Sequence, residues 1–396
     1  MSWETIKLGD CCEITSSKRI FYSEYTDHGV PFYRSKEIIE CSQGQSISEP
    51  LYITNQRYDE IKNKFGVPVA GDMLLTSVGT IGIPYIVKET DEFYFKDGNL
   101  TWFRNFTNKL CAQYLYYWVT SKEGTGVLNN TTIGSSQKAL TISALKNIEI
   151  TVPPIENQRR IADILFAYDD LIENNRKQIK LLEEAAQRLY KEWFVDLRFP
   201  GHEHTKIVDG VPEGWEKQPL SSIADIRMGQ SPKSEFYNQI GEGLPFHQGV
   251  GSYGNRFVRD ETYSTSFTRI AEAGSILFSV RAPVGRLNIT KNKIVIGRGI
   301  AALNHKSRLQ SFLFYMLKER FFKDNLVGNG SIFASISKEE LLNQQFIIPC
   351  EDIMVQYDKA AQNIDDRIAT LDRQTELLTQ ARDRLLPKLM SGEVEV

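Results

Sequence analysis

Apolar residues recur at alternating steps of three and four along two stretches of the chain, 161–193 and 357–389. This heptad spacing predicts two long helices, each roughly 50 Å at the helical rise, whose narrow apolar stripe must be buried against a partner helix. The predicted seam positions are Ile161, Leu165, Tyr168, Ile172, Asn175, Ile179, Leu182, Ala186, Leu189 and Trp193, and then Tyr357, Ala361, Ile364, Ile368, Leu371, Thr375, Leu378, Arg382, Leu385 and Leu389. We expect the polar Asn175 to fix the register at some cost in stability, and Arg382 is a charged defect in the second stripe.

The two stretches are copies of one sequence. Between residues 169–189 and 365–385, nine of 21 positions are identical at a constant offset of 196. The likeness continues upstream, where AGDMLLTSVGTIGIP from Ala70 resembles AGSILFSVRAPVGRL from Ala273, and Trp3 resembles Trp215, at offsets of 203 and 212. The chain is therefore predicted to be one plan used twice, a globular region followed by a long helix.

The globular regions predict an α+β fold. MLLTSV and ILFSV are short apolar runs typical of buried strands, and the segments from Lys109 and Arg308 have helical apolar spacing. NNTTIGSSQKALT and VGNGSIFASISK are expected to be loops. We expect globular α+β domains at 1–153 and 199–349, and helical regions at 154–198 and 350–396, with the helices paired as an antiparallel coiled coil about a pseudo-two-fold axis. Two alternatives stay open: each helix packs only on its own globular region, or two chains dimerise through the seams.

Composition favours a folded cytoplasmic protein. No apolar run is long enough for a membrane span, and the N-terminus lacks the features of a signal peptide. The five cysteines, an odd number without a CxxC pair, are expected to be reduced. Residues 227–323 hold 15 Lys and Arg against 6 Asp and Glu, whereas residues 1–153 hold 15 against 17 and both helical regions are acidic. Positive charge is thus concentrated in the second globular region.

Motifs for catalysis and metal binding are missing. The sequence has no phosphate-binding GxxxxGK[ST], no HExxH, no GxSxG, and no Asn or Asp before a Pro-Pro-aromatic run. Gly79 and Gly82 are followed by Pro84 rather than a helix, so a turn is expected instead of a dinucleotide loop. His202 and His204 lack a third ligand, so we expect no metal site. Catalysis by this chain alone is not expected.

One family combines these features. Trp3-x-x-x-x-Leu8-Gly9, GVPFYRSKEI, AGDMLLTSVGTIG, SSQKALTISALKNIEITVPPIENQRRIADIL, WFVDLRFPG and VPEGW, followed by a second round, resemble the specificity subunit of type I restriction-modification systems over the whole chain. The resemblance implies two domains that each read half of a bipartite double-stranded DNA target, with no active site and no cofactor on this chain. It also implies two methyltransferase subunits that bind S-adenosylmethionine, and restriction and translocase subunits that use ATP and Mg. The sequence departs from its own repeat at Ser16 and Ser17, where the second copy has Met228 and Gly229.

Residue type nominates DNA contacts on the loops, because Arg and Lys suit guanine and phosphate, Gln and Asn suit adenine, and Ser and Thr suit either. The first-domain candidates are Lys18, Arg19, Tyr33, Arg34, Ser35, Lys36, Thr76, Ser77, Thr80, Ser135, Ser136, Gln137 and Lys138. The second-domain candidates are Gln230, Ser231, Lys233, Gln248, Arg256, Ser279, Arg281, Arg298, Asn329 and Ser331. Lys36 and Arg281 are the favoured members. Since the first domain lacks a basic surplus, its DNA face is expected to be locally asymmetric or weaker.

Two other functions remain as alternatives. A coiled-coil scaffold with duplicated peptide- or ligand-binding domains would bind with little dependence on salt, whereas DNA binding weakens steeply with salt. A degenerate nuclease would cleave DNA by itself in the presence of a metal ion.

Overall fold

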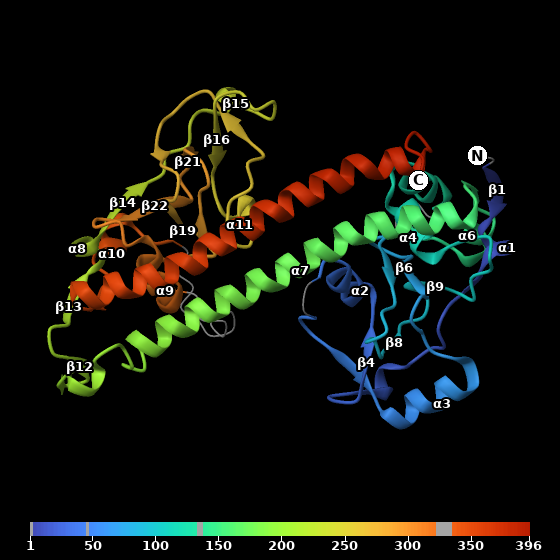
Figure 1. Ribbon diagram of the computed structural model, residues 1–396, viewed down its shortest axis with the longest axis horizontal. Helices are drawn as coiled ribbons and strands as arrows, with labels where there is room; N and C mark the ends of the chain where they lie inside the picture. Colours follow the sequence, from blue (N-terminus) through green and yellow to red (C-terminus); the bar gives the residue numbers. More distant parts are fainter. Residues whose placement is uncertain (1–2, 45–46, 133–137, 322–334) are drawn as a thin grey trace. The chain divides into compact units, whose positions relative to one another are not determined.

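Both heptad stretches form continuous helices of 40 residues, α7 (Ile155–Phe194) and α11 (Glu351–Met390) (Figure 1). The computed structural model describes residues 3–44, 47–132, 138–321 and 335–396. α7 begins directly after Pro154, whose carbonyl accepts the N–H of Gln158 at 3.1 Å, and α11 begins directly after Cys350, whose carbonyl accepts the N–H of Met354 at 3.2 Å. All twenty seam positions are buried or half-buried, so the predicted helices and their apolar faces are confirmed.

The chain divides into two compact units, residues 1–176 with 373–396, and residues 177–372. In the first unit Ile161 and Leu165 share a core with Leu385 and Leu389. In the second unit the Tyr357 hydroxyl donates a hydrogen bond of 3.1 Å to the backbone oxygen of Ala186. Early residues of one helix thus lie beside late residues of the other in each unit, and the helices pack antiparallel as predicted.

The first globular region contains three sheets. An antiparallel pair joins β1 (Glu4–Lys7) to β10 (Glu149–Val152). A four-stranded antiparallel sheet has the order β2 (Glu13–Thr15), β9 (Leu100–Arg104), β6 (Met73–Thr76) and β7 (Pro84–Ile86). The third has the order β3 (Tyr25–Thr26), β5 (Leu51–Ile53), β4 (Val30–Tyr33) and β8 (Tyr94–Phe95), with β4 and β8 parallel. The helices are α1 (Leu8–Cys11), α2 (Ser35–Ser42), α3 (Asn55–Phe65), α4 (Ala112–Thr120), α5 (Lys122–Thr131) and α6 (Ile142–Lys146).

The second globular region repeats this plan. β13 (Glu216–Pro219) pairs with β23 (Gln345–Ile348), and a four-stranded sheet has the order β14 (Ala224–Met228), β22 (Ile300–His305), β19 (Ile276–Ser279) and β20 (Leu287–Ile289). The third sheet has the order β15 (Tyr237–Asn238), β17 (Tyr263–Ser264), β16 (Leu244–His247), β21 (Ile294–Ile296) and β18 (Ile270–Ala271). Its helices are α8 (Leu220–Ile223), α9 (Gln310–Phe321) and α10 (Lys338–Leu342), and the small hairpin of β11 (Ile207–Val208) and β12 (Val211–Pro212) precedes β13.

The unequal sequence offsets have a structural cause. α2 and α3 belong to the first unit, whereas residues 229–275 of the second unit hold only short strands and single 3₁₀ turns. The offset therefore falls from 212 at β1 and β13 to 203 at β6 and β19, because the first unit is longer between these strands. The strand pair and the four-stranded antiparallel sheet keep the same order in both regions, and the third sheet gains one strand, β18, in the second, which supports the prediction that the globular regions are duplicates.

The two central strands are buried on both faces. In β6, Met73 and Leu75 face a core with Tyr114 and Trp118 of α4, while Leu74 faces a second core. The side chains of β19 likewise alternate between two separate cores. A strand enclosed on both sides gains from a continuous apolar run rather than an alternating one. The predicted strands and the predicted helices α4 and α9 are confirmed.

Two further features bear on the predictions. Within the part of the chain that the structure describes, no helix combines the length and apolar character needed to cross a membrane. All five cysteines are free thiols, with Cys11 and Cys12 buried.

Candidate nucleic-acid interface

The same hairpin loop follows the central strand in each domain. Thr76 Oγ1 accepts a hydrogen bond from the backbone N–H of Ile83 at 2.9 Å, and Ser279 Oγ accepts one from Arg286 at 2.8 Å. These positions correspond at the offset of 203, so the loops 77–82 and 280–285 are closed by one device. Thr76 and Ser279 are buried, and their hydroxyls are occupied in shaping the loop. The prediction that they contact DNA is corrected to a positioning role.

Ser77 needs the same correction. Its hydroxyl bonds to the Leu75 carbonyl at 3.1 Å and to Thr101 Oγ1 at 2.7 Å, and the residue is buried. Its backbone serves the loop as well, because Leu140 N–H donates to the Ser77 carbonyl at 2.9 Å and so returns the segment 138–140 to the hairpin. Thr80, at the tip of this loop, and Lys138 are exposed.

In the second domain, four segments meet at one end of the strands, and we name them the second loop cluster: 229–231, 247–249, 280–281 and 296–300. The backbone N–H of Gln230 donates to the carbonyl of Ile296 at 2.9 Å, and the backbone N–H of Gly299 donates to the carbonyl of Gln248 at 3.1 Å. Val280 N–H donates to Gly299 at 3.0 Å, and Ser231 Oγ accepts from the backbone of Arg298 at 3.2 Å. The fold thus brings Gln230, Ser231, Gln248, Arg281 and Arg298 together, although up to 68 positions separate them in the sequence.

Arg298 is presented between two obligatory glycines. A Cβ atom on Gly299 would lie 2.4 Å from the Gln248 carbonyl, and one on Gly297 would lie 2.9 Å from Ser231 Oγ. Only glycine permits this approach of backbones. Arg281 and Arg298 are both exposed, and among the described residues neither guanidinium has a hydrogen-bond or ion-pair partner. Just beyond the cluster, Lys233 Nζ lies 3.9 Å from Glu235 Oε1.

The first domain builds an equivalent first loop cluster from segments 16–19, 33–36, 77–80 and 96–99. The backbone N–H of Lys96 donates to the Tyr33 carbonyl at 2.8 Å, and the equivalent bond in the second domain joins Gly297 to His247. The backbone N–H of Ser77 donates to the Asn99 carbonyl at 2.8 Å, and its equivalent joins Val280 to Gly299. Ser35 Oγ donates to the Asn99 carbonyl at 3.4 Å. The sequence-predicted residues of this region are therefore neighbours, and Arg34 takes the place that Gln248 has in the second domain.

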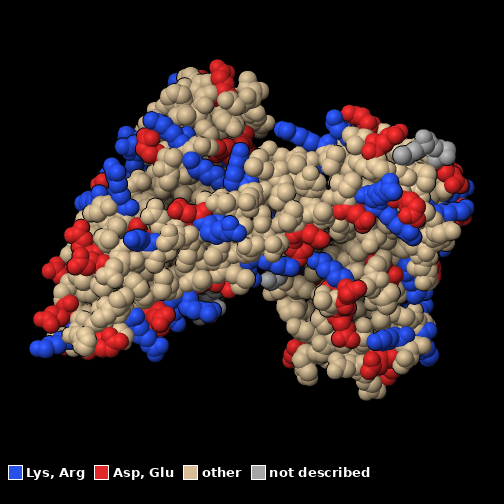
Figure 2. Space-filling view, in the orientation of Figure 1, with Lys and Arg blue, Asp and Glu red and all other residues tan. Residues whose placement is uncertain are grey.

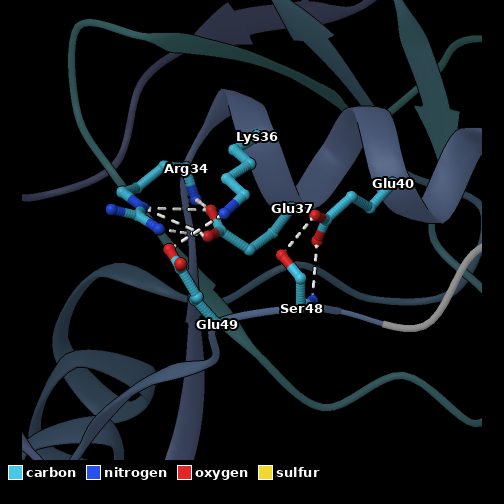
Figure 3. A network of polar contacts seen from close by, with 6 residues as sticks. All are labelled: Arg34, Lys36, Glu37, Glu40, Ser48 and Glu49. Atoms are coloured by element: carbon cyan, nitrogen blue, oxygen red, sulfur yellow. Dashed lines mark hydrogen bonds and ion pairs between the residues drawn. The ribbon is translucent and has the colours of Figure 1, made fainter. Parts of the chain in front are cut away.

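The charges of the first loop cluster are largely neutralised from within. Arg19 Nε lies 2.9 Å from Asp97 Oδ2, and Arg34 Nη2 lies 2.5 Å from Glu37 Oε1. Figure 3 shows Arg34 and Lys36 beside their carboxylate partners on and opposite α2, with Lys36 Nζ 2.9 Å from Glu49 Oε2. The hydrogen bonds that Arg34 donates to Glu37 raise the pKa of Arg34, and the bond that Lys36 donates to Glu49 lowers the pKa of Glu49.

Lys18 and Tyr33 are the remaining first-domain candidates with a described environment. The Lys18 ammonium lies 4.8 Å from the ring centroid of Phe65, and the Lys18 backbone N–H donates to Tyr94 Oη at 2.6 Å. The Tyr33 ring stacks on Phe93 at 4.4 Å, and burial raises the pKa of Tyr33. Ser135, Ser136, Gln137, Asn329 and Ser331 lie outside the described residues.

Arg256 is a wrong prediction. It is only 3% exposed, and its guanidinium lies 2.5 Å from Asp365 Oδ1 and 3.8 Å from the ring centroid of Phe314. Tyr315 Oη donates to the same carboxylate at 2.8 Å. Arg256 therefore fastens the second domain to α11 and has no access to DNA.

The equivalent carboxylate in the first unit explains Arg382. Asp169 corresponds to Asp365 at the offset of 196. The Asp169 carboxylate accepts a hydrogen bond of 2.6 Å from the Tyr117 hydroxyl and forms an ion pair with Arg382. Arg382 is thus a partner for α7 and not a defect in the seam. Identity at Asp169 and Asp365 was the available signal, since a charged residue retained beside a seam points to a specific bond.

A Ser–His–Asp chain was not predicted. His247 is 1% exposed, with Nδ1 2.8 Å from Ser252 Oγ and Nε2 3.0 Å from Asp260 Oδ1. Burial opposes ionisation of Asp260, but hydrogen bonds from His247 and Asn292 keep the pKa of this carboxyl below its usual value. These bonds brace the segment that carries Gln248. Among the described residues no group of His, Cys, Asp and Glu is arranged to hold a metal ion.

Charge on the visible face does not collect into one basic surface. Figure 2 shows Lys and Arg interspersed with Asp and Glu over both units.

Comparison with known proteins identifies the family. A family model described as the type I restriction modification DNA specificity domain matches residues 1–184 and 212–386. The chain is 29% identical to the MjaX specificity subunit and 27% identical to the type I restriction enzyme MjaIX specificity subunit, both of Methanocaldococcus jannaschii, over 100% of this chain and 94% of each relative. In fold it is similar to the S subunit of a type I restriction-modification system from M. genitalium, with a TM-score of 0.64, 16% identity, and coverage of 98% of this chain and 96% of that one. The chain therefore belongs to the family of type I restriction modification DNA specificity domains.

Proposed function

We propose that each globular domain of this DNA specificity subunit binds one half of a bipartite duplex target through its loop cluster. The observation that carries the proposal is the repeated construction of the two clusters, in which equivalent backbone bonds join equivalent loops while the side chains differ. A shared frame with different side chains suits two domains that read different bases. The domains are assigned to residues 1–153 and 199–349, and the helical regions to 154–198 and 350–396.

The bases and phosphates would be contacted by the exposed members of the clusters. In the second domain these are Gln230, Gln248, Arg281 and Arg298, and in the first they are Lys18, Lys36 and Thr80, with the exposed Lys138 beside the hairpin loop. Arginine and glutamine can form paired hydrogen bonds with guanine and adenine in the major groove, and lysine suits phosphate. Thr76, Ser77 and Ser279 support the loops from beneath.

The partners follow from this role. The subunit, itself without a cofactor, positions two methyltransferase subunits that bind S-adenosylmethionine on the target, and restriction and translocase subunits that use ATP and Mg join them in the cytoplasm. The long helices offer a rigid surface for such assembly.

Exchange of residues 1–153 for the corresponding domain of a relative tests the proposal. The hybrid, co-expressed with its methyltransferase partner, is expected to change one half of the methylated sequence and to leave the other half intact, as read by mapping methylation across a genome. A change in both halves would show that the domains do not read independently.

Salt dependence separates this function from the scaffold alternative. Neutralisation of several phosphates makes affinity fall steeply with salt. A flat response, together with failure to select any sequence from a random duplex library, would favour a scaffold that binds peptides or other ligands.

A further inference from the structure

The two loop clusters share one backbone frame but differ in the state of their charges. The β8–β9 turn of the first domain has Lys96, Asp97 and Gly98 before Asn99, where the β21–β22 turn of the second domain has Gly297 and Arg298 before Gly299. Gly98 N–H donates to Ser16 Oγ at 3.4 Å and Arg298 N–H donates to Ser231 Oγ at 3.2 Å, so a serine hydroxyl braces each turn. The first turn therefore contains a carboxylate, whereas the second contains an arginine and no acidic residue.

Three basic side chains of the first cluster are paired with carboxylates of the same domain. The turn residue Asp97 holds Arg19, and Glu37 and Glu49 hold Arg34 and Lys36 (Figure 3). The Glu37 carboxylate is fully buried and also accepts the backbone N–H of Arg34 at 2.7 Å. If Arg34 turned away to bind a DNA phosphate, the buried Glu37 carboxylate would lose its cationic partner. An unpaired buried charge is costly in folding free energy. Arg34 is therefore committed to the fold.

Lys36 is held more loosely. Both Lys36 and Glu49 are exposed, and exposed ion pairs contribute little to stability. A DNA phosphate can take the place of Glu49, but the carboxylate then stays close to the duplex and opposes it. These three paired cations consequently add little net attraction for DNA.

The second cluster has no such restraint. Arg281 and Arg298 lie on turns whose backbones are held by the β14–β22–β19–β20 sheet and by the close packing at Gly297 and Gly299. Among the described residues, their guanidinium groups have no carboxylate partner. Residues 227–323 around them carry nine more basic than acidic side chains. Preorganised, unpaired cations can bind phosphates without breaking an internal bond.

We propose that the second domain is the electrostatic anchor of this subunit, through Arg281 and Arg298, and that internal ion pairs limit the electrostatic contribution of the first domain. This division of labour rests on the proposed function, because both domains must bind DNA for it to exist. It names Glu49 as a residue that restrains the affinity of the first domain.

Salt titration of matched double variants tests the division. The full chain is purified in complex with its methyltransferase partner, and its affinity for a duplex with both half-sites is measured at several salt concentrations. Each phosphate contact contributes about 0.9 to the slope of log K against log salt. Arg281→Ala/Arg298→Ala is expected to lower the slope by about 2 and to weaken binding on all sequences, and Lys18→Ala/Lys36→Ala to lower it by less than about 1.

Lys217→Ala/Arg308→Ala is the matched control, since both residues are exposed and lie outside the cluster, Lys217 in β13 and Arg308 beyond the end of β22 that is opposite the cluster. It is expected to leave the slope unchanged. Glu49→Gln is expected to tighten binding and to steepen the slope, because the competing carboxylate is gone. All these side chains are exposed, so an unchanged thermal unfolding midpoint will verify the fold.

The possible outcomes are distinct. Equal slope losses for the two domain variants, a loss of the same size in the control, or no tightening by Glu49→Gln would overturn the inference while DNA recognition stands. Failure of the unmodified complex to bind any duplex sequence-specifically would instead remove the proposed function itself.

Discussion

Asp169 and Asp365 occupy the same position in the duplicated helix and accept a hydrogen bond from equivalent tyrosines, Tyr117 and Tyr315. A cation completes each site, but from different places. In the first unit Arg382 of α11 supplies it, whereas the equivalent position in α7 is Ala186 and Arg256 of the second domain supplies it instead. The carboxylate is retained because it joins the domain to the helices, and the cation can come from any element within reach.

The adjacent aspartates allow a controlled test. Asp365→Ala leaves the buried guanidinium of Arg256 with only the more distant Glu183, at 4.0 Å, so the free energy of unfolding is expected to fall by about 3 kcal/mol. Denaturant unfolding of the full chain measures this loss. Asp366→Ala, at the exposed neighbouring position, is expected to change it by less than about 0.5 kcal/mol. Similar effects of the two variants would contradict the docking role.

At the scale of the elements, β22 carries a buried histidine at its end. His305 Nδ1 accepts the backbone N–H of Ser307 at 3.1 Å, and the ring lies near Phe312 of α9. Burial lowers the pKa of His305 from 6.5 to about 4. Below pH 6.5 the unfolded chain therefore takes up a proton that the folded chain excludes, and the free energy of unfolding falls as the pH drops toward 4.

His305→Asn tests this element. The Asn amide oxygen can accept the Ser307 N–H but does not titrate, so the variant is expected to lose less thermal stability between pH 7.5 and pH 5.5 than the unmodified chain. Melting curves at the two pH values provide the measurement. His28→Asn, at an exposed position, is the control and should keep the original pH dependence. If the His305 variant lost as much thermal stability between the two pH values as the unmodified chain, His305 would be excluded as the cause.

At the scale of the whole molecule, the paired helices depend on equal length. Deletion of residues 172–178 from α7 removes one heptad of the seam and leaves apolar positions of α11 without partners. We expect lower stability and impaired assembly with the methyltransferase partner, measured by thermal unfolding and size-exclusion chromatography. Deletion of 172–178 together with 368–374 keeps the two seams matched and should recover stability while it alters the spacing between half-sites. Normal assembly of the single deletion would argue against a paired seam.

Periodic and local features could be predicted from the sequence. Heptads located α7 and α11, and the apolar runs located β6 and β19, because burial of a face imposes a repeat that is visible residue by residue. Duplication added the pairing of the helices. Even so, the polar Arg382 was misread, since its partner Asp169 lies 213 positions away in the sequence.

The candidate interface was predicted only in part. Arg281, Arg298 and Gln248 were nominated by residue type, and the fold brings them together as exposed side chains. Arg256 has the same chemistry yet is buried, and Thr76 and Ser279 turned out to brace loops. Residue type indicates what a side chain can bind, but its exposure and competing partners depend on contacts distant in sequence.

The sequence by itself determined the duplication, the long helices, the buried central strands and the family. These follow from periodicity and repetition, which are local or self-comparing properties. Only the tertiary structure decided which arginines are free and which are bound, that Asp97 and Arg298 stand at equivalent turns, and that Asp169 and Asp365 fasten the domains. Such facts depend on pairwise distances between segments far apart in the chain, and electrostatic and hydrogen-bond energies depend on those distances and on burial.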